Sequence, residues 1–327
     1  MTIRRRDFLS ASAAALAFGA AFERTGGAAA PAKTLRGIFP IAQTPFTASN
    51  KLDVDSLVEQ VRFIHRGRVH GFVWPQLASE WETLTEPERL EGAEAIAATG
   101  KGLSPAIVIG VQAPDTAAAA RYAKHAQKIG ADAIISLPPA NQSDPAAILE
   151  YYKEVGKATD LPLFCQAVGN LSVEAILSMY RAIPTLRYVK DEAGEPLMRL
   201  AELRSKNNDE LKVFTGGHGR TLIDEMIRGF SGSMPAASFA DVYASAWDLW
   251  HEGKKREAVD EFGSAAILIH EISTYPEGMK YILYLRGIFK TYHSRQAGRG
   301  RNAARLDETG QQVLRLLLDL MKPRLRA

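Results

Sequence analysis

Short apolar segments alternate with amphipathic segments along most of this chain. The apolar runs, rich in β-branched or aromatic residues, cover residues 37–42, 71–74, 106–111, 133–137, 161–165, 186–189, 211–214 and 229–234. Between them, helical spacing of apolar positions covers 53–65, 116–128, 145–158, 172–181, 196–204 and 220–227, and Thr85-Glu86-Pro87-Glu88 has the signals of a further helix start. Continuous apolar strands separated by helices are typical of a parallel sheet with its outside covered. Eight such units predict a closed (β/α)₈ TIM barrel.

The segment from about residue 239 has no strand pattern. It is typical of four helices, including 265–272 and the very apolar 313–321. We therefore expect a barrel over 33–238 and a helical extension over 239–327 packed on it. The alternative architecture is a doubly wound open sheet, but no glycine-rich phosphate loop follows the first strand to support it.

The N-terminal segment resembles an export signal. Three arginines, Arg4 to Arg6, precede Asp7-Phe8-Leu9 and an alanine-rich run over 10–22, which is typical of a twin-arginine signal. Ala30-Pro31-Ala32 supplies a small-x-small cleavage site, so we expect a mature chain from about Lys33 and a periplasmic location. The alternative is a basic tail that is not a signal.

Composition excludes several classes of function. Residues 1–32 hold four Arg, one Asp and one Glu, so without them the formal net charge falls from +3 to +1. This leaves no basic field for a nucleic acid, and we expect no membrane association after signal cleavage. Cys165 is the only cysteine, which excludes an intrachain disulfide. With 46% hydrophobic residues, the mature chain can bury one large core by itself.

Candidate chemistry follows the strands, because barrels of this class carry their active sites on the loops after the strands. The residues in those places are 43–45, 76–80, Gln112, 138–141, Gln166, 190–192, 216–218 and 234–235. Lys190 is the most informative, because a lysine at the end of a strand can point into the mouth of the barrel. A desolvated lysine loses several units from its reference pKa of about 10.4 and becomes a nucleophile toward ketones. The alternative is a surface lysine at the strand end.

Metal chemistry has no support in the sequence. The seven histidines are scattered and no acidic cluster has the spacing of a metal site, so we predict no metal and no other cofactor.

Several motifs occur in an order typical of a known family. They are Gly37-Ile38-Phe39-Pro40 with Thr44-Pro45-Phe46, Glu80-x-x-Thr83-Leu84-Thr85-x-x-Glu88-Arg89, Gly130-Ala131-Asp132-Ala133 with Pro138-Pro139, Asp160-Leu161-Pro162, Val189-Lys190-Asp191 and Gly229-x-x-Gly232. Together they resemble the dihydrodipicolinate synthase and N-acetylneuraminate lyase superfamily over nearly all of residues 35–300. The resemblance implies a (β/α)₈ barrel with extra C-terminal helices, often tetrameric. It also implies that a sixth-strand lysine forms a Schiff base with pyruvate or another 2-oxo acid, and Lys190 is the match.

The resemblance also suggests roles for other residues. Thr44, in the Thr-Pro-Phe motif, can order a proton relay, and an N-cap or strand-end role is the alternative. Glu80 matches the glutamate after the second strand, and it binds either the substrate or backbone groups of its own loop. The remaining candidates for substrate binding are Leu77, Ala78, Asn141, His218 and Met234.

The chain also departs from the family pattern. Gln76-Leu77-Ala78-Ser79-Glu80 replaces a Gly-Thr-Thr-Gly-Glu type stretch that binds the 2-oxo acid carboxylate. Gln166 stands where the family has its catalytic tyrosine, and an amide cannot shuttle a proton as a phenol does. Leu171 replaces a substrate-binding arginine and Asn141 replaces another tyrosine.

Three functions stay open at this point. In the first, a small carbonyl substrate forms an imine with Lys190, and His218, Glu192 or a water held by Gln166 moves the protons. In the second, the barrel binds a small molecule without turnover, and Lys190 pairs with Asp191 or with an anion. In the third, an acid/base enzyme never forms an imine.

A homo-oligomer is also expected. An apolar stripe at Tyr281, Tyr284, Leu285 and Ile288 offers a surface to another subunit, although a helix that faces the core would look the same.

Overall fold

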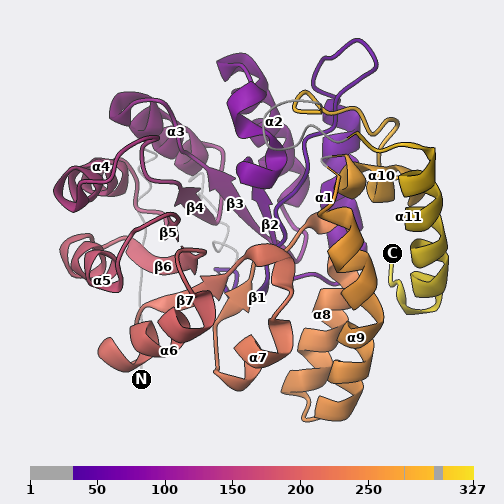
Figure 1. Cartoon of the computed structure of the whole chain (residues 1–327). Coiled ribbons are helices and arrows are strands. Elements are labelled where there is room, and N and C mark those ends of the chain that lie inside the picture. The colour runs from indigo at the N-terminus through magenta and orange to yellow at the C-terminus, as the bar shows by residue number, and fades with distance from the viewer. Residues whose placement is uncertain (1–31, 276, 298–304) are drawn as a thin grey trace, which may run out of the picture. The chain divides into compact units, whose positions relative to one another are not determined.

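The structure is a computed structural model that describes residues 32–275, 277–297 and 305–327; the predicted signal over 1–32 lies outside them except for Ala32. From Lys33 on, the chain forms one compact unit. Within the described residues, eight parallel strands form the barrel wall and helices cover it (Figure 1). The strands are β1 (Gly37–Ile38), β2 (Gly71–Trp74), β3 (Ala106–Gly110), β4 (Ala133–Ser136), β5 (Leu163–Ala167), β6 (Leu186–Asp191), β7 (Lys212–Thr215) and β8 (Gly232–Ser233). The predicted TIM barrel is confirmed.

The strands follow one another around the ring, and β1 pairs with β8. Backbone hydrogen bonds just beyond β1 bring it to β2: the Ala42 N–H donates to the Val73 carbonyl over 2.9 Å, and the Val73 N–H donates to the Pro40 carbonyl over 3.1 Å. Because the order is cyclic, β2 and β6 stand on opposite sides of the ring. This placement decides which side chains face each other across the mouth.

Helices alternate with the strands as the periodicity predicts. They are α1 (Val54–Arg66), α2 (Glu86–Gly100), α3 (Thr116–Lys128), α4 (Pro145–Lys157), α5 (Val173–Ala182), α6 (Pro196–Lys206), α7 (Leu222–Ile227) and α8 (Ala240–His251). The start of α2 is a capping box: the Glu88 N–H donates to the Thr85 hydroxyl, and the Thr85 N–H donates to the Glu88 carboxylate. This arrangement explains why the predicted start at Thr85 holds.

Two hydrophobic cores result from this alternation. Side chains on one face of each strand fill the barrel interior, where the ring of Phe214 packs edge-on against those of Phe39 and Phe164 with centroids 5.3 and 5.2 Å away. The other face of each strand packs against the helices in a larger core. The interior is therefore a packed plug that supports the mouth rather than a channel.

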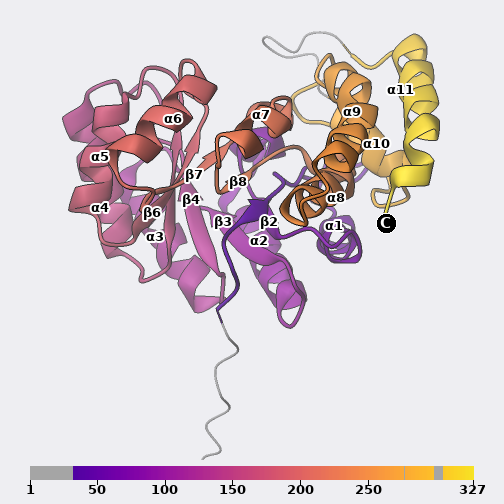
Figure 2. The same ribbon diagram turned by 90° about the horizontal axis from the view of Figure 1, so that it is seen from below.

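The boundary of the extension differs from the expected one. Helix α8 contacts β1 and completes the eighth strand-helix unit, so the barrel continues to His251 and does not end at 238. The extension then comprises α9 (Lys255–Ile272), α10 (Gly278–Leu285) and α11 (Glu308–Met321), which gather at one side of the barrel (Figure 2). No described helix is both long enough and apolar enough to span a bilayer.

The apolar stripe of α10 mostly faces inward. Tyr281 is fully buried and Ile288 nearly so, whereas Tyr284 is exposed. Packing within the chain therefore accounts for most of this stripe, which does not by itself indicate a subunit interface.

Candidate active site

Lys190 lies where strand β6 meets the mouth of the barrel. It pairs in register with Gln166 of β5 and Phe214 of β7, and only 4% of its surface is exposed. Its Nζ is 2.8 Å from Oε2 of Glu192, and both side chains line a cavity of about 310 Å³ at the carboxyl ends of the strands. The buried Lys190 amine therefore lies beside the Glu192 carboxylate and beside a cavity that can hold a ligand.

Glu192 is held in place by three donors. Besides Lys190, Oε2 accepts from the Gln166 side-chain amide over 2.6 Å, and Oε1 accepts from the Gly217 N–H over 3.0 Å. Burial alone would raise the pKa of Glu192, but the charge of Lys190 and these hydrogen bonds together hold the pKa below its usual value. The carboxylate is therefore ionised at neutral pH.

Glycine at position 216 makes this geometry possible. A Cβ there would lie 1.9 Å from Oε1 of Glu192, far inside van der Waals contact. The backbone of Gly216 is not in the left-handed region, so the requirement comes from the space that Glu192 occupies. The glycine pair after β7 thus has a second role beside forming a turn.

Asp191 points away from the cavity. Its carboxylate accepts from Nε of Arg199 over 2.9 Å and from the Ala193 N–H over 3.1 Å. Burial raises the pKa of Asp191, and the charge of Arg199 opposes the rise. Lys190 therefore pairs with Glu192, and the expected alternative of a pair with Asp191 is wrong.

His218 lines the same cavity beyond strand β7. Its φ of 60° places it in the left-handed region, which is uncommon for a residue with a side chain. Burial lowers the pKa of His218 from its usual value of 6.5, and the nearby charges of Arg220 and Lys190 lower it further against the effect of Glu192. The imidazole is neutral at pH 7 and can accept a proton.

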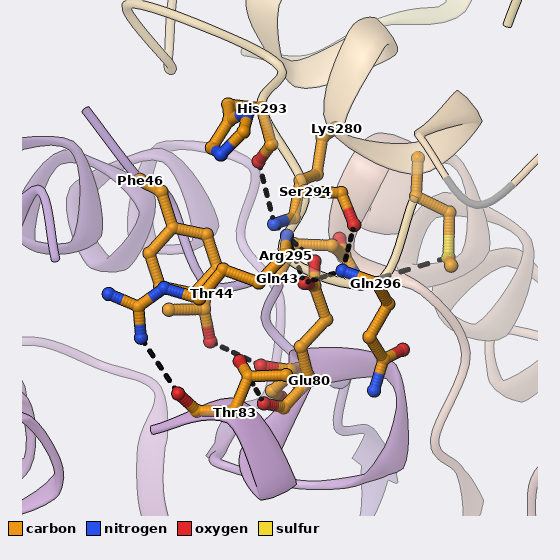
Figure 3. Close-up of polar contacts among 12 residues, drawn as sticks. Gln43, Thr44, Phe46, Glu80, Thr83, Lys280, His293, Ser294, Arg295 and Gln296 are labelled. Carbon is orange, nitrogen blue, oxygen red and sulfur yellow. Dashed lines mark hydrogen bonds and ion pairs between the residues drawn. The ribbon is translucent and has the colours of Figure 1, made fainter. Parts of the chain in front are cut away.

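A second ion pair stands on the opposite side of the mouth, after β2. Glu80 pairs with Lys280 of α10, and Oε2 of Glu80 accepts from the backbone N–H groups of Arg295 and Gln296 over 2.8 and 3.2 Å (Figure 3). The ammonium of Lys280 also donates to the His293 carbonyl over 3.0 Å. Burial lowers the pKa of Lys280 to about 8, against the raising effect of Glu80. Both charged groups line the cavity.

Most of the residues expected to bind substrate come together here. Leu77, Ala78, Glu80, His218 and Met234 line the cavity beside Lys190. Glu80 accepts hydrogen bonds from backbone N–H groups, which was one of its two predicted roles. These N–H groups belong to the C-terminal extension and not to the loop that carries Glu80.

Three expected residues do not line this cavity. The buried Thr44 hydroxyl donates to the Ser79 carbonyl over 2.5 Å and accepts from the Trp74 indole over 2.9 Å, and Thr44 is not among the residues that line the cavity. Gln166 is fully buried behind Glu192. Asn141 lines a second cavity, of about 480 Å³, near Trp81 and not near Lys190.

Gln43, one of the positions expected after the strands, also lines the cavity. The sequence did not single out three further polar residues there, which are Lys280 on α10 and Ser294 and Gln296 beyond α10. One signal for Lys280 was available: a charged residue sits inside the otherwise apolar run from Met279 to Leu283. In the parts of the chain that the structure describes, no group of three or more His, Cys, Asp or Glu is placed to hold a metal ion.

The sequence matches the model of the Dihydrodipicolinate synthetase family over residues 34–300. The chain belongs to this family. An L-2-keto-3-deoxyarabonate dehydratase of Azospirillum brasilense is 28% identical over 244 residues, which cover 72% of this chain and 79% of the relative. An uncharacterized DapA-like lyase of Thermococcus onnurineus is 25% identical over 267 residues, which cover 77% of this chain and 89% of the relative. The family model and these relatives identify the chain as a member of a lyase and aldolase family.

Solved structures agree on the fold. The dihydrodipicolinate synthase of Rhodopseudomonas palustris superposes with a TM-score of 0.77 at 24% identity, over 87% of this chain and 97% of that one. An N-acetylneuraminate lyase of Mycoplasma synoviae superposes with a TM-score of 0.76 at 19% identity, over 87% of this chain and 97% of that one. At these identities the likeness establishes the barrel with its C-terminal helices, and the reaction has to be argued from the site.

Proposed function

We propose that this protein is a Schiff-base-forming lyase or aldolase that acts on a 2-oxo acid or a related carbonyl compound through Lys190. One observation carries the proposal: the buried Lys190 amine is 2.8 Å from the Glu192 carboxylate and borders a cavity at the mouth. Family membership supports the same class of reaction, and one relative is named as an L-2-keto-3-deoxyarabonate dehydratase.

In the proposed reaction, Glu192 first takes a proton from the Lys190 ammonium, because only the neutral amine can attack a carbonyl. The amine nitrogen then bonds to the carbonyl carbon, and a proton moves from that nitrogen to the carbonyl oxygen. Glu192 returns its proton to the resulting hydroxyl, which leaves as one water molecule, and an iminium remains on Lys190. The iminium withdraws electrons, so the adjacent carbon can lose a proton or break a C–C bond.

Other residues have supporting roles in this proposal. The neutral His218 is the candidate acceptor for a substrate proton, because it lines the same cavity. Gln166 is a positioning residue that acts through Glu192, since its amide bonds that carboxylate. Glu192 thereby takes over the proton transfer that the family assigns to a tyrosine.

Reductive trapping tests the proposal. The protein is incubated with pyruvate and a panel of other 2-oxo acids and aldehydes, reduced with borohydride and analysed by intact mass and peptide mapping. We expect one adduct, on Lys190, that Lys190→Met abolishes and that Lys212→Met, which alters an exposed lysine of β7, leaves in place. No adduct on Lys190 across the panel would reject the proposal. Ligand-dependent thermal stabilisation that survives Lys190→Met without any adduct would instead favour a binding barrel without turnover.

We also propose that the protein is exported through the twin-arginine route to the periplasm and forms a homo-oligomer. The paired arginines before an alanine-rich run support export. Changing Arg4, Arg5 and Arg6 together to Lys should keep the protein in the cytoplasmic fraction if this is right. Light scattering of the mature chain tests the oligomer, and a monomer mass at working concentrations would contradict it.

A further inference from the structure

His218 lies in a loop after strand β7 whose backbone is unusual. Gly217, His218 and Gly219 have φ values of 57°, 60° and 65°, so three successive residues occupy the left-handed region. Glycine adopts this region readily, but a residue with a side chain is disfavoured there. A histidine between two such glycines keeps this conformation because neighbouring groups hold it there.

Tyr243 of α8 is one of the groups that hold the loop. Its hydroxyl donates to the His218 carbonyl over 2.5 Å. The direction of that carbonyl is set by ψ of His218 and φ of Gly219, the two dihedral angles that flank the planar peptide group. A return of His218 to the right-handed region would turn the carbonyl and break this hydrogen bond. The hydroxyl of Tyr243 therefore stabilises the left-handed conformation of His218.

Tyr243 is itself held firmly in place. Its side chain is 1% exposed, and its ring stacks on Phe239 with centroids 5.5 Å apart and contacts Phe262 of α9 with centroids 6.0 Å apart. Gly219 allows the ring to approach the loop this closely, because a Cβ at position 219 would lie 2.8 Å from Cε1 of Tyr243. The hydroxyl therefore has little freedom to move away from the loop.

The same loop contacts the Lys190 site on its other side. The Gly217 N–H donates to Oε1 of Glu192 over 3.0 Å. His218 lines the cavity, and its imidazole is close enough to Lys190 and Glu192 for both charges to affect its pKa. Tyr243 does not line the cavity, so any effect of its hydroxyl on the chemistry has to pass through the loop.

We propose that Tyr243 is a positioning residue: its hydroxyl fixes the backbone of His218 so that the imidazole stays in the cavity and can take a proton from the carbon next to the iminium. The inference rests on the proposed Schiff base on Lys190. In the step concerned, the C–H bond breaks, its electron pair forms a C=C bond, and the π pair of the C=N bond returns to the nitrogen of Lys190. The proton goes to the neutral imidazole, and Tyr243 gives up none.

Deuterium exchange separates this step from imine formation. When pyruvate is attached to Lys190, exchange of its methyl protons with D₂O measures proton removal from the adjacent carbon, whereas borohydride trapping measures imine formation alone. Both rates are determined for the unmodified protein, for Tyr243→Phe, for His218→Asn and for the double variant. Asparagine is chosen at position 218 because it tolerates the left-handed region.

We expect Tyr243→Phe to slow exchange about tenfold, the effect of a misplaced proton acceptor, while adduct formation stays within about twofold of normal. His218→Asn should slow exchange about 100-fold. The double variant should be no slower than His218→Asn, because the hydroxyl acts only through His218. Normal exchange in Tyr243→Phe, additive losses in the double variant, or no exchange in unmodified protein that forms the adduct would each overturn the proposal.

Tyr152→Phe is the matched control. Tyr152 is also fully buried and its hydroxyl donates to the Ser136 carbonyl over 2.6 Å, but it does not line the cavity. Each of the two variants removes a buried hydroxyl from a carbonyl, so both should lose stability, and only Tyr243→Phe should slow exchange. Equal slowing in both would indicate a general effect of lower stability and contradict the positioning role.

A magnetic resonance titration of the His218 imidazole tests the contact without substrate. Its pKa should lie below 6.5 in the unmodified protein and in Tyr152→Phe, and should move toward 6.5 in Tyr243→Phe as the imidazole becomes more exposed. If no oxo acid is trapped on Lys190 but this shift occurs, the Schiff base fails and Tyr243 still positions His218. If pyruvate is trapped but the pKa and the exchange rate are normal in Tyr243→Phe, the Schiff base stands and the positioning role fails.

Discussion

At the scale of single residues, the proposed Schiff-base chemistry depends on the Glu192 carboxylate. Replacing Glu192 by Gln keeps an oxygen for the Gly217 N–H but removes the proton acceptor 2.8 Å from Lys190. We expect the rate of adduct formation with an active oxo acid to fall about 10²–10⁴-fold, the usual contribution of a positioned acid/base group. Rapid-quench trapping with borohydride measures this rate.

The control for that experiment is Glu195→Gln, because Glu195 is a neighbouring carboxylate that does not line the cavity. It should react at nearly the normal rate. An unchanged rate in Glu192→Gln, in protein shown to be folded by circular dichroism, would mean that another group accepts the proton.

The sequence predicted Lys190 but gave no comparable signal for its partners. Lys190 follows from its place at the end of an apolar strand, which the pattern reveals directly. In the sequence, Glu192 cannot be told apart from an ordinary carboxylate that precedes a helix. Only the fold shows that its side chain turns back toward Lys190. The Glu80 contact with Arg295 joins residues 215 positions apart, and no local pattern encodes it.

At the scale of secondary-structure elements, the loop after β7 offers a test with a built-in control. In Gly216→Ala the added Cβ must displace the Glu192 carboxylate, because the two would lie 1.9 Å apart. We expect adduct formation to slow about 10- to 100-fold, which is less than in Glu192→Gln because the carboxylate is displaced and not removed. The free energy of unfolding should change little. Trapping kinetics and urea denaturation measure the two effects.

Gly217→Ala should behave in the opposite way. Its φ of +57° is unfavourable for alanine by about 1 kcal/mol, but no atom lies within 4 Å of the new Cβ. Stability should therefore fall more than activity. If the two alanine variants gave the same ratio of lost activity to lost stability, the steric role assigned to Gly216 would be wrong.

A buried ion pair joins the C-terminal end of α10, the helix that carries Lys280, to α8. Arg286 donates to the Asp241 carboxylate over 2.9 and 2.8 Å, and both side chains are almost fully buried. Arg286→Met leaves Asp241 charged and without this partner, so we expect the free energy of unfolding to fall by about 3–5 kcal/mol. Urea denaturation measures the change.

Arg228→Met is the comparison for that prediction, because it breaks an exposed pair with Asp224. It should change the free energy of unfolding by about 1 kcal/mol or less. If Arg286→Met changed stability no more than Arg228→Met, the attachment of α10 would have to depend on apolar packing alone.

The elements themselves were largely predictable. Helix α3 has the predicted bounds and α4 ends one residue early, because apolar spacing and caps are local properties of the sequence. Strand β5 begins two residues later than expected and continues to Ala167, which puts Gln166 inside the strand. The predicted extension included α8 because no strand pattern separates α8 from the three helices after it, so the sequence does not mark where the last barrel helix ends.

At the scale of the whole molecule, the extension and the barrel are linked through a titratable group. Glu88, at the start of α2, accepts from the Arg295 guanidinium over 2.6 and 2.9 Å. The hydrogen bonds from Arg295 lower the pKa of Glu88 from 4.5 to about 2, against the effect of burial. A carboxyl group whose pKa is lower in the folded state stabilises the fold above its unfolded pKa and loses that contribution as the pH falls.

Glu88→Gln should therefore reduce the free energy of unfolding by about 1–2 kcal/mol at pH 7, a value discounted for solvent screening. The gap from the unmodified protein should close as the pH falls from about 4.5 toward 2, where the folded protein also protonates Glu88. Urea denaturation at pH 7, 4 and 3 measures the gap. Glu86→Gln, in the same helical turn but exposed, should change stability by about 0.5 kcal/mol or less. A gap that stayed constant between pH 7 and pH 3 would show that Arg295 holds the extension to α2 without help from the charge on Glu88.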